Sequence, residues 1–116
     1  MVTLKRSEEI ARKAAQMPGA QGVFLRRLIT QEDGAAHFVM RLFEVEAGGH
    51  TPRHRHAHEH EVYILSGRGS VVGTQGEVSL QAGSAVFVPP QEEHQFINGG
   101  SQPLVFLCMV PATADG

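Results

Sequence analysis

Hydrophobic and polar positions alternate in short runs along most of the chain. From Gly22 onward, stretches rich in Val, Phe, Leu and Ile are separated by clusters of Gly, Pro, Asn or Asp about every ten residues. This punctuation is typical of β-strands joined by tight turns. The pattern predicts strands at 22–30, 36–46, 51–58, 60–66, 69–73, 76–81, 85–89, 94–98 and 103–110. We therefore expect an all-β fold, either a closed barrel or a double-sheet jelly roll.

The two ends of the chain differ from this pattern. Residues 1–21 form an N-terminal segment with a helix-compatible stretch from Ser7 to Gln16, which Pro18 and Gly19 end. Ser7 is a suitable N-cap, and the glutamates that follow it suit the first turn of a helix. We assign residues 22–112 to a single barrel domain and predict a frayed tail from Ala112.

Composition narrows the class of protein. The 116 residues, 41% of them hydrophobic, suffice for one domain with its own core. Ten Lys and Arg against twelve Asp and Glu, without a long basic run, disfavour a nucleic-acid partner. The single Cys108, the absence of a signal-peptide pattern and the absence of a membrane-spanning apolar stretch predict a soluble, cytoplasmic protein without a membrane partner.

Histidines are the unusual feature, because four of the seven stand at alternate positions 54, 56, 58 and 60. In an unbroken strand they would share one face, and the outer two would lie roughly 20 Å apart. Four imidazoles in such a row cannot reach one metal ion. A metal site needs a bend, for which Ala57–Glu59 is suitable, and a further ligand from elsewhere in the chain.

Two segments resemble the two sequence motifs of the cupin superfamily. The first motif, G-x5-H-x-H-x3-E-x6-G, is matched by Gly48, His54, His56, position 60 and Gly67. The second, G-x5-P-x-G-x2-H-x3-N, is matched by Gly83, Pro89, position 91, His94 and Asn98. The chain departs from the pattern twice, with His60 in place of Glu and Gln91 in place of Gly. It looks similar to the small single-domain bacterial cupins.

This resemblance implies a double-stranded β-helix, the cupin jelly-roll barrel, with one divalent transition metal. The implied ligands are His54, His56, His60 and His94, and the rival to His60 is Glu61. Mn or Fe is favoured by the family, and imidazole also accepts Zn, Ni, Cu and Co. Four neutral histidines would leave a divalent ion at +2. His58 falls outside the motif, in the bend or behind the ligands, and His37 and His50 are ordinary surface or packing residues.

The alternation of side chains along the strands predicts which residues line the pocket. Val62 and Ile64 share the parity of His60, and Phe96 shares that of His94. On the last strand either Leu104, Phe106, Cys108 and Val110 or the alternate set faces inward, and the resemblance favours Phe106 and Cys108. Both also fit a simple role in the core. Arg41 lies either on the solvent face or at the pocket mouth, where it would hold a carboxylate.

The leading functional prediction is a Mn- or Fe-dependent oxidoreductase of dioxygenase type acting on a small apolar or aromatic molecule. The alternatives are a metal-dependent isomerase or lyase, for which Glu61 could act as base, and a non-catalytic module that binds metal or a small ligand. The resemblance also implies a homodimer. We expect pairing through the N-terminal segment and the strand Gly22–Thr30, because an uncovered edge strand invites a partner.

Overall fold

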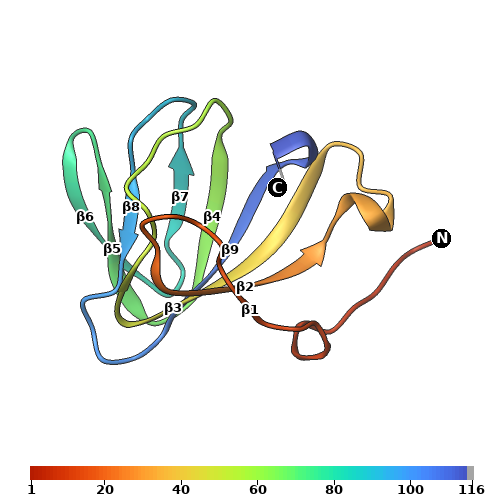
Figure 1. Cartoon of the computed structure of the whole chain (residues 1–116), viewed down its shortest axis with the longest axis horizontal. Helices are drawn as coiled ribbons and strands as arrows, with labels where there is room; N and C mark the ends of the chain where they lie inside the picture. Colours follow the sequence, from red (N-terminus) through yellow and green to blue (C-terminus); the bar gives the residue numbers. More distant parts are fainter. Residues whose placement is uncertain (115–116) are drawn as a thin grey trace.

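Residues 1–114 form nine β-strands and three short 3-10 turns (Figure 1). The structure is a computed structural model, and it describes residues 1–114. The strands are β1 (Lys13–Ala14), β2 (Gln21–Ile29), β3 (Phe38–His50), β4 (His60–Ser66), β5 (Arg68–Gly73), β6 (Gly76–Gln81), β7 (Ala85–Val88), β8 (Gln95–Ile97) and β9 (Leu104–Pro111). The turns are η1 (Ser7–Glu9), η2 (Gln31–Asp33) and η3 (Ala112–Ala114). Over residues 1–114 no helix is long and apolar enough to cross a membrane.

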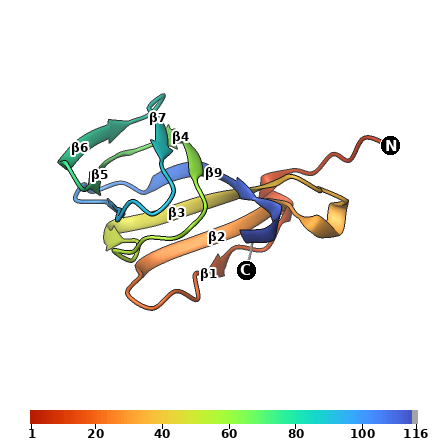
Figure 2. The same cartoon turned by 90° about the horizontal axis from the view of Figure 1, so that it is seen from above.

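All strand pairs are antiparallel and form one curled sheet in the order β6-β5-β8-β3-β9-β4-β7, with β2 on β3 and β1 on β2. Figure 2 shows the sheet folding over, so that β6 and β7 lie above β3 and β2. This arrangement confirms the all-β jelly-roll prediction. The curl leaves β6 and β7, the two ends of the path, as edges that do not pair with one another among the described residues.

Strand β3 belongs to both halves of the curled sheet. Its first part pairs with β9, and its last residue, His50, pairs with Ile97 of β8. The strand was predicted to end before Ala47. It continues because Gly48 adopts a left-handed φ of 79°, which lets the strand bend without ending.

The interior is filled by alternate residues of the strands. Along β9 the buried positions are Leu104, Phe106, Cys108 and Val110, which settles the choice that the sequence left open. Phe106 stacks on Phe43 of β3 at a ring distance of 5.4 Å and on Phe96 of β8 at 4.9 Å. These aromatic rings join the two halves of the barrel beneath the histidines.

Three local predictions were wrong. The stretch from Ser7 to Gln16 is not a helix, and its backbone turns at η1 and pairs with β2 as β1. Such a short segment is marginal as an isolated helix, and strand pairing offers its backbone other partners. Residues 51–58 form a loop with a single bridge at His54. The predicted tail begins with η3, where Ala112 is 1% exposed and its N–H donates to the His37 carbonyl. The last two residues lie outside the described part.

Candidate metal centre

The loop between β3 and β4 carries three of the histidines, and the backbone fastens it to the second motif. His54 and His94 exchange two backbone hydrogen bonds, with N···O distances of 3.1 and 2.9 Å. Their rings lie 5.1 Å apart, and His60 enters from the first position of β4. His54 and His94, which are forty residues apart in the chain, therefore lie side by side. His94 is thus placed to add a ligand to those of the loop.

The imidazole rings of the predicted ligands surround a common space. The Nε2 atoms of His56 and His60 lie 2.6 Å apart, and the His94 ring lies 4.9 Å from that of His56 and 5.3 Å from that of His60. The nitrogens form two overlapping groups, each with all members within 4.8 Å, and His56 belongs to both. One group adds His54 and His94, and the other adds His58 and His60.

His58 is closer to this cluster than the sequence indicated. Its ring stacks on that of His56 at a distance of 3.9 Å with an angle of 2° between the planes. The sequence places it in the bend because it falls outside the motif. The loop Thr51–Glu59 is irregular, so strand alternation gives no guide to where a side chain of this loop points.

Three rings are held from behind, through Nδ1. The Nδ1 of His56 lies 2.8 Å from the His58 carbonyl oxygen, and that of His94 lies 2.8 Å from the Glu92 carbonyl oxygen. The Nδ1 of His60 lies 3.3 Å from the sulfur of Cys108. A ring that donates from Nδ1 keeps the lone pair of Nε2 free for a metal ion. These contacts orient the rings as metal ligation requires.

Burial favours the neutral form of His54, His58, His60 and His94. It lowers the pKa of His54, His58 and His94 below the ordinary value of 6.5, and it lowers the pKa of His60 to about 2, with further contributions from His56, His94 and Arg41. Metal ligation needs neutral imidazoles, so these rings are in the binding form near neutral pH. A donor set of neutral imidazoles suits Mn, Fe, Co, Ni, Cu and Zn.

The histidines open on a cavity of about 150 Å³, which we call the histidine cavity. Its other walls come from Met17, Arg41, Phe43, Thr51, Phe96, Phe106, Cys108 and Ala114. Arg41, Phe96, Phe106 and Cys108 line this cavity. The sequence left the side of Arg41 open, and it gave Phe106 and Cys108 a role in the core as the alternative. Val62 and Ile64 are not: they are 3% and 0% exposed and belong to the core beneath it.

Four wall residues were missed by sequence reasoning: Met17, Phe43, Thr51 and Ala114. Phe43 could have been found, because it shares the parity of Arg41 on β3. Met17 and Ala114 come from the two terminal segments, which carry no regular pattern. Their position depends on how the chain ends fold back on the barrel.

Arg41 is the one cation among the described walls of the histidine cavity other than histidine. Its Nη2 lies 3.6 Å from the Cys108 sulfur, and its guanidinium carbon lies 5.1 Å from the centre of the Phe43 ring. Its Nε is buried and has no hydrogen-bond acceptor. Leaving a buried donor unpaired costs about 1–3 kcal/mol, more where the group is charged.

Glu61 does not reach the histidines. It lies on the outer side of β4, in a surface hollow with His37, Phe38 and Glu59 among its walls. Hydrogen bonding with the Glu59 carboxyl, together with partial burial, raises the pKa of Glu61 to about 6. Strand alternation separates it from His60, so the structure gives no support to Glu61 as rival ligand or as base at the cavity.

The other motif positions have structural roles. Gly67 has a φ of 87°, and Gln91, in place of the motif glycine, has a φ of 67° at the third position of the turn Pro89–Glu92. The Asn98 amide donates to the carbonyls of Val45 and Gln102 at 2.9 and 2.8 Å. These residues shape the turns that carry the histidines.

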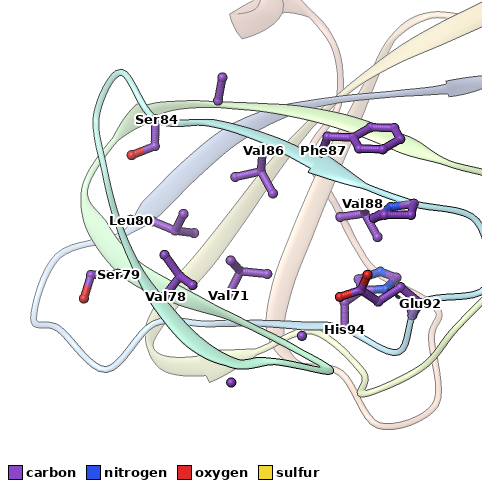
Figure 3. Close-up of a pocket in the computed structure, with 14 residues that line it drawn as sticks. Val71, Val78, Ser79, Leu80, Ser84, Val86, Phe87, Val88, Glu92 and His94 are labelled. Atoms are coloured by element: carbon purple, nitrogen blue, oxygen red, sulfur yellow. Dashed lines mark hydrogen bonds between the residues drawn. The ribbon is translucent and has the colours of Figure 1, made fainter.

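A second cavity, of about 500 Å³, lies between the unpaired edges β6 and β7 (Figure 3), and we call it the seam cavity. Val71 and Val78 face it from one side and Val86 from the other. His94 lines both cavities. The sequence did not predict the seam, because it arises where the curled sheet fails to close.

A single curled antiparallel sheet with a histidine cluster inside is typical of a class of small β-barrel proteins. Comparison with known protein families identifies this class. The cupin domain family matches residues 41–110. The chain belongs to this family, which confirms the resemblance seen in its motifs.

Three similar proteins have names that indicate different functions. A 1-methylthio-D-xylulose 5-phosphate methylsulfurylase of Rhodospirillum rubrum is 40% identical over 76 residues, which are 66% of this chain and 49% of that protein. An oxalate-binding protein of Thermotoga maritima is 30% identical over 94% of this chain and 93% of its own. The polyketide cyclase RemF of Streptomyces resistomycificus has a TM-score of 0.92 at 36% identity, over 97% of this chain and 80% of its own. The chain spans about half the length of the Rhodospirillum protein.

Proposed function

We propose that this protein binds one divalent transition metal through His54, His56, His60 and His94 and acts on an oxygen-bearing small molecule in the histidine cavity. The observation that carries the proposal is the orientation of the rings: His56, His60 and His94 are held at Nδ1. When bound, the metal would supply Lewis-acid polarisation of a substrate oxygen. The cavity walls would orient the substrate and exclude water.

Chemistry other than oxygenation is the form of this proposal that the comparisons favour. The three similar proteins are a cyclase, a methylsulfurylase and an oxalate-binding protein, and none of them is named as an oxygenase. The oxidoreductase prediction therefore receives no support from them. We accordingly propose a metal-dependent rearrangement, elimination or cyclisation, which corresponds to the isomerase or lyase alternative of the sequence.

The dioxygenase-type reaction is the second candidate, and the aromatic walls favour it. Phe43, Phe96 and Phe106 line the cavity and suit an apolar or aromatic substrate. Oxygen uptake separates the candidates. A substrate that the Mn- or Fe-loaded protein converts with consumption of dioxygen would favour this candidate, and conversion under nitrogen would favour the first. Binding of the same molecule without conversion would favour the non-catalytic module.

Elemental analysis tests the metal proposal. The protein is purified without a nickel column, and its content of Mn, Fe, Co, Ni, Cu and Zn is measured before and after reconstitution at pH 8. We expect about one equivalent of one metal, with Mn or Fe as our proposal for the native ion. No bound metal under either condition would contradict the proposal.

We further propose that two copies of the chain pair. The observation is a set of large apolar side chains that are exposed on the outside of the sheet: Phe38 at 61%, Phe87 at 59%, Tyr63 at 46% and Leu65 at 44%. The edge of β2 is less open than the sequence indicated, since β1 pairs with Phe24 and Leu25. Light scattering should give a dimer that Tyr63→Lys weakens, and a monomeric parent would contradict this.

A further inference from the structure

Arg41 lies between two cavities, and this position indicates which chemical group the substrate carries. Met17, Arg41 and Phe43 line both the histidine cavity and a neighbouring cavity of about 490 Å³. This neighbouring cavity, which we call the N-terminal chamber, is enclosed by the segment Ile10–Met17, which lies over β2 and β3. Figure 2 shows this segment and β1 running alongside β2. The two cavities therefore border one another at Arg41, and its side chain is within reach of a ligand in either of them.

The charge of Arg41 has no protein partner among residues 1–114. Its nitrogens make one polar contact, from Nη2 to the Cys108 sulfur at 3.6 Å, and Nε is buried without an acceptor. The register of β3 on β9 places Arg41 opposite Cys108, in the row that points into the barrel. Arg41 is partly buried, and a cation held away from water is normally paired with a carboxylate or another anion. A bound anion would supply this partner.

The surroundings increase the excess of positive charge. The described walls of the histidine cavity include no aspartate and no glutamate, and neither do those of the N-terminal chamber. Lys13 and Arg27 are two further cationic residues at the wall of the chamber. Four neutral imidazoles would also leave the charge of a divalent metal uncompensated. Among apolar walls such as Phe43 and Phe106, these cations favour a bound anion with an apolar body.

We infer that Arg41 anchors the anionic group of the substrate, and that the substrate is a carboxylate with an apolar or aromatic body. This inference rests on the proposed function and adds the substrate class. A planar carboxylate matches the two-pronged donor geometry of a guanidinium, which an ammonium does not reproduce. The body of the substrate lies against Phe43 and Met17 and extends into the N-terminal chamber. Arg41 is thus a binding residue, beside the histidines and separate from the ligand set.

Benzoate is the probe for this inference, and benzamide is its neutral counterpart of equal shape. The protein is loaded with one equivalent of Co²⁺, and the visible absorption of the ion is followed during titration with each compound. We expect benzoate to bind at least about tenfold more tightly than benzamide. In Arg41→Met, the affinity for benzoate should fall by about tenfold or more, while the cobalt content stays that of the parent. Arg41→Lys should recover part of the loss.

Arg68→Met is the matched control, because Arg68 is an exposed residue of β5 outside both cavities. Its affinity for benzoate should equal that of the parent. Equal benzoate affinity in Arg41→Met and parent would overturn the inference. So would benzamide binding as tightly as benzoate, a comparison that needs only the parent protein and does not depend on the folding of any variant.

Two further measurements separate the possible failures. Phenyl phosphate is titrated in parallel, and if it binds more than tenfold more tightly than benzoate, the carboxylate class is wrong. If the protein binds no Co²⁺, the proposed function fails. Calorimetry with benzoate on metal-free parent and Arg41→Met then tests the anion site by itself. Binding that disappears in Arg41→Met would support the inference, and its absence in the parent would overturn it.

Discussion

The two cavities that meet at His94 differ in almost every property. The histidine cavity, of about 150 Å³, is surrounded by titratable and aromatic groups from the loop Thr51–Glu59 and from the four strands β3, β4, β8 and β9. The seam cavity, of about 500 Å³, is lined mainly by aliphatic residues, and Val78 and Phe87 at its rim are 62% and 59% exposed. The larger space results from two sheet edges that do not meet. The smaller one brings together five histidines, Arg41 and Cys108, whereas the larger one has only Glu92 and the shared His94 among its described titratable walls, so chemistry and not volume identifies the site.

His94 belongs to both cavities, and its removal is expected to have the largest effect. His94→Ala takes away an imidazole that three other histidine rings contact. We expect metal affinity to fall more than about a hundredfold, because the loss of a ligand exceeds the 10–100-fold typical of outer-shell partners. Elemental analysis and competition with a chelator measure the loss.

Glu92→Gln is the control for His94→Ala. Glu92 lines the seam cavity, and its carboxylate accepts hydrogen bonds from the backbone and hydroxyl of Thr74 at 3.3 Å each. The variant should keep the metal of the parent, because the contact of Glu92 with His94 is made by its backbone carbonyl. If Glu92→Gln lost metal as completely as His94→Ala, the distinction between the two cavities would be wrong.

Acid should destabilise the metal-free protein through the histidine cavity. The folded pKa of His60 is about 2 and its ordinary value is 6.5, so the unfolded chain binds the proton more readily between these pH values. The contribution of neutral His60 to the free energy of unfolding is therefore fully present above about pH 6.5. It falls as the pH decreases, by up to about 1.4 kcal/mol per pH unit for such a group. Urea unfolding at pH 7.5 and 5.5 measures the difference.

The pH dependence can be assigned with one variant. His60→Phe replaces the buried imidazole with a ring that does not titrate, and its stability should change less between pH 7.5 and 5.5 than that of the parent. An equal slope in both proteins would mean that the acid sensitivity arises elsewhere. The seam cavity has no buried histidine other than His94 among its described walls, so substitutions such as Val78→Thr should leave the slope unchanged.

Removing the Cys108 contact behind the His60 ring should reduce metal affinity less than removing the ring itself. Cys108 is 1% exposed, and its sulfur lies 3.3 Å from Nδ1 of His60. Cys108→Ala removes this contact, and we expect a loss of metal affinity of about tenfold. Val110→Ala is the control, because it removes apolar volume from the same inward row of β9 at a position outside the walls of the histidine cavity. An equal loss of affinity in both variants would indicate a packing effect.

Local signals predicted those parts of the molecule that depend on local geometry. Alternation identified the strands, and the motif spacing brought His54 and His94 to one place. The inward position of Arg41 could also have been decided, since it shares the parity of the buried Val39, Phe43 and Val45. The sequence left it open because a charged residue in an apolar strand is more often at the surface.

Other features depend on contacts between distant segments, which no pattern in the sequence encodes. Met17 and Ala114 reach the histidine cavity because both ends of the chain fold back over the barrel. The segment near Lys13 pairs as a strand because β2 offers an open edge. The stacking of His58 on His56 follows from the irregular path of the loop. The seam cavity reflects the failure of the curled sheet to close, a property of all the strands together.

The turn Pro89–Glu92 connects the two cavities, and its substitution should give the smallest effect. Pro90 and Gln91 occupy its central positions, and the Gln91 N–H donates to the His56 carbonyl at 2.8 Å. At a φ of 67° a side chain is strained, and glycine is not. Gln91→Gly should therefore raise the free energy of unfolding by up to about 1 kcal/mol, with part of the gain offset by the greater freedom of glycine in the unfolded chain. Gln91→Ala keeps the strain and should bring no gain. Metal content should be that of the parent in both variants, because the hydrogen bond to His56 comes from the backbone. A destabilised Gln91→Gly would show that the glutamine side chain itself supports the wall between the two cavities.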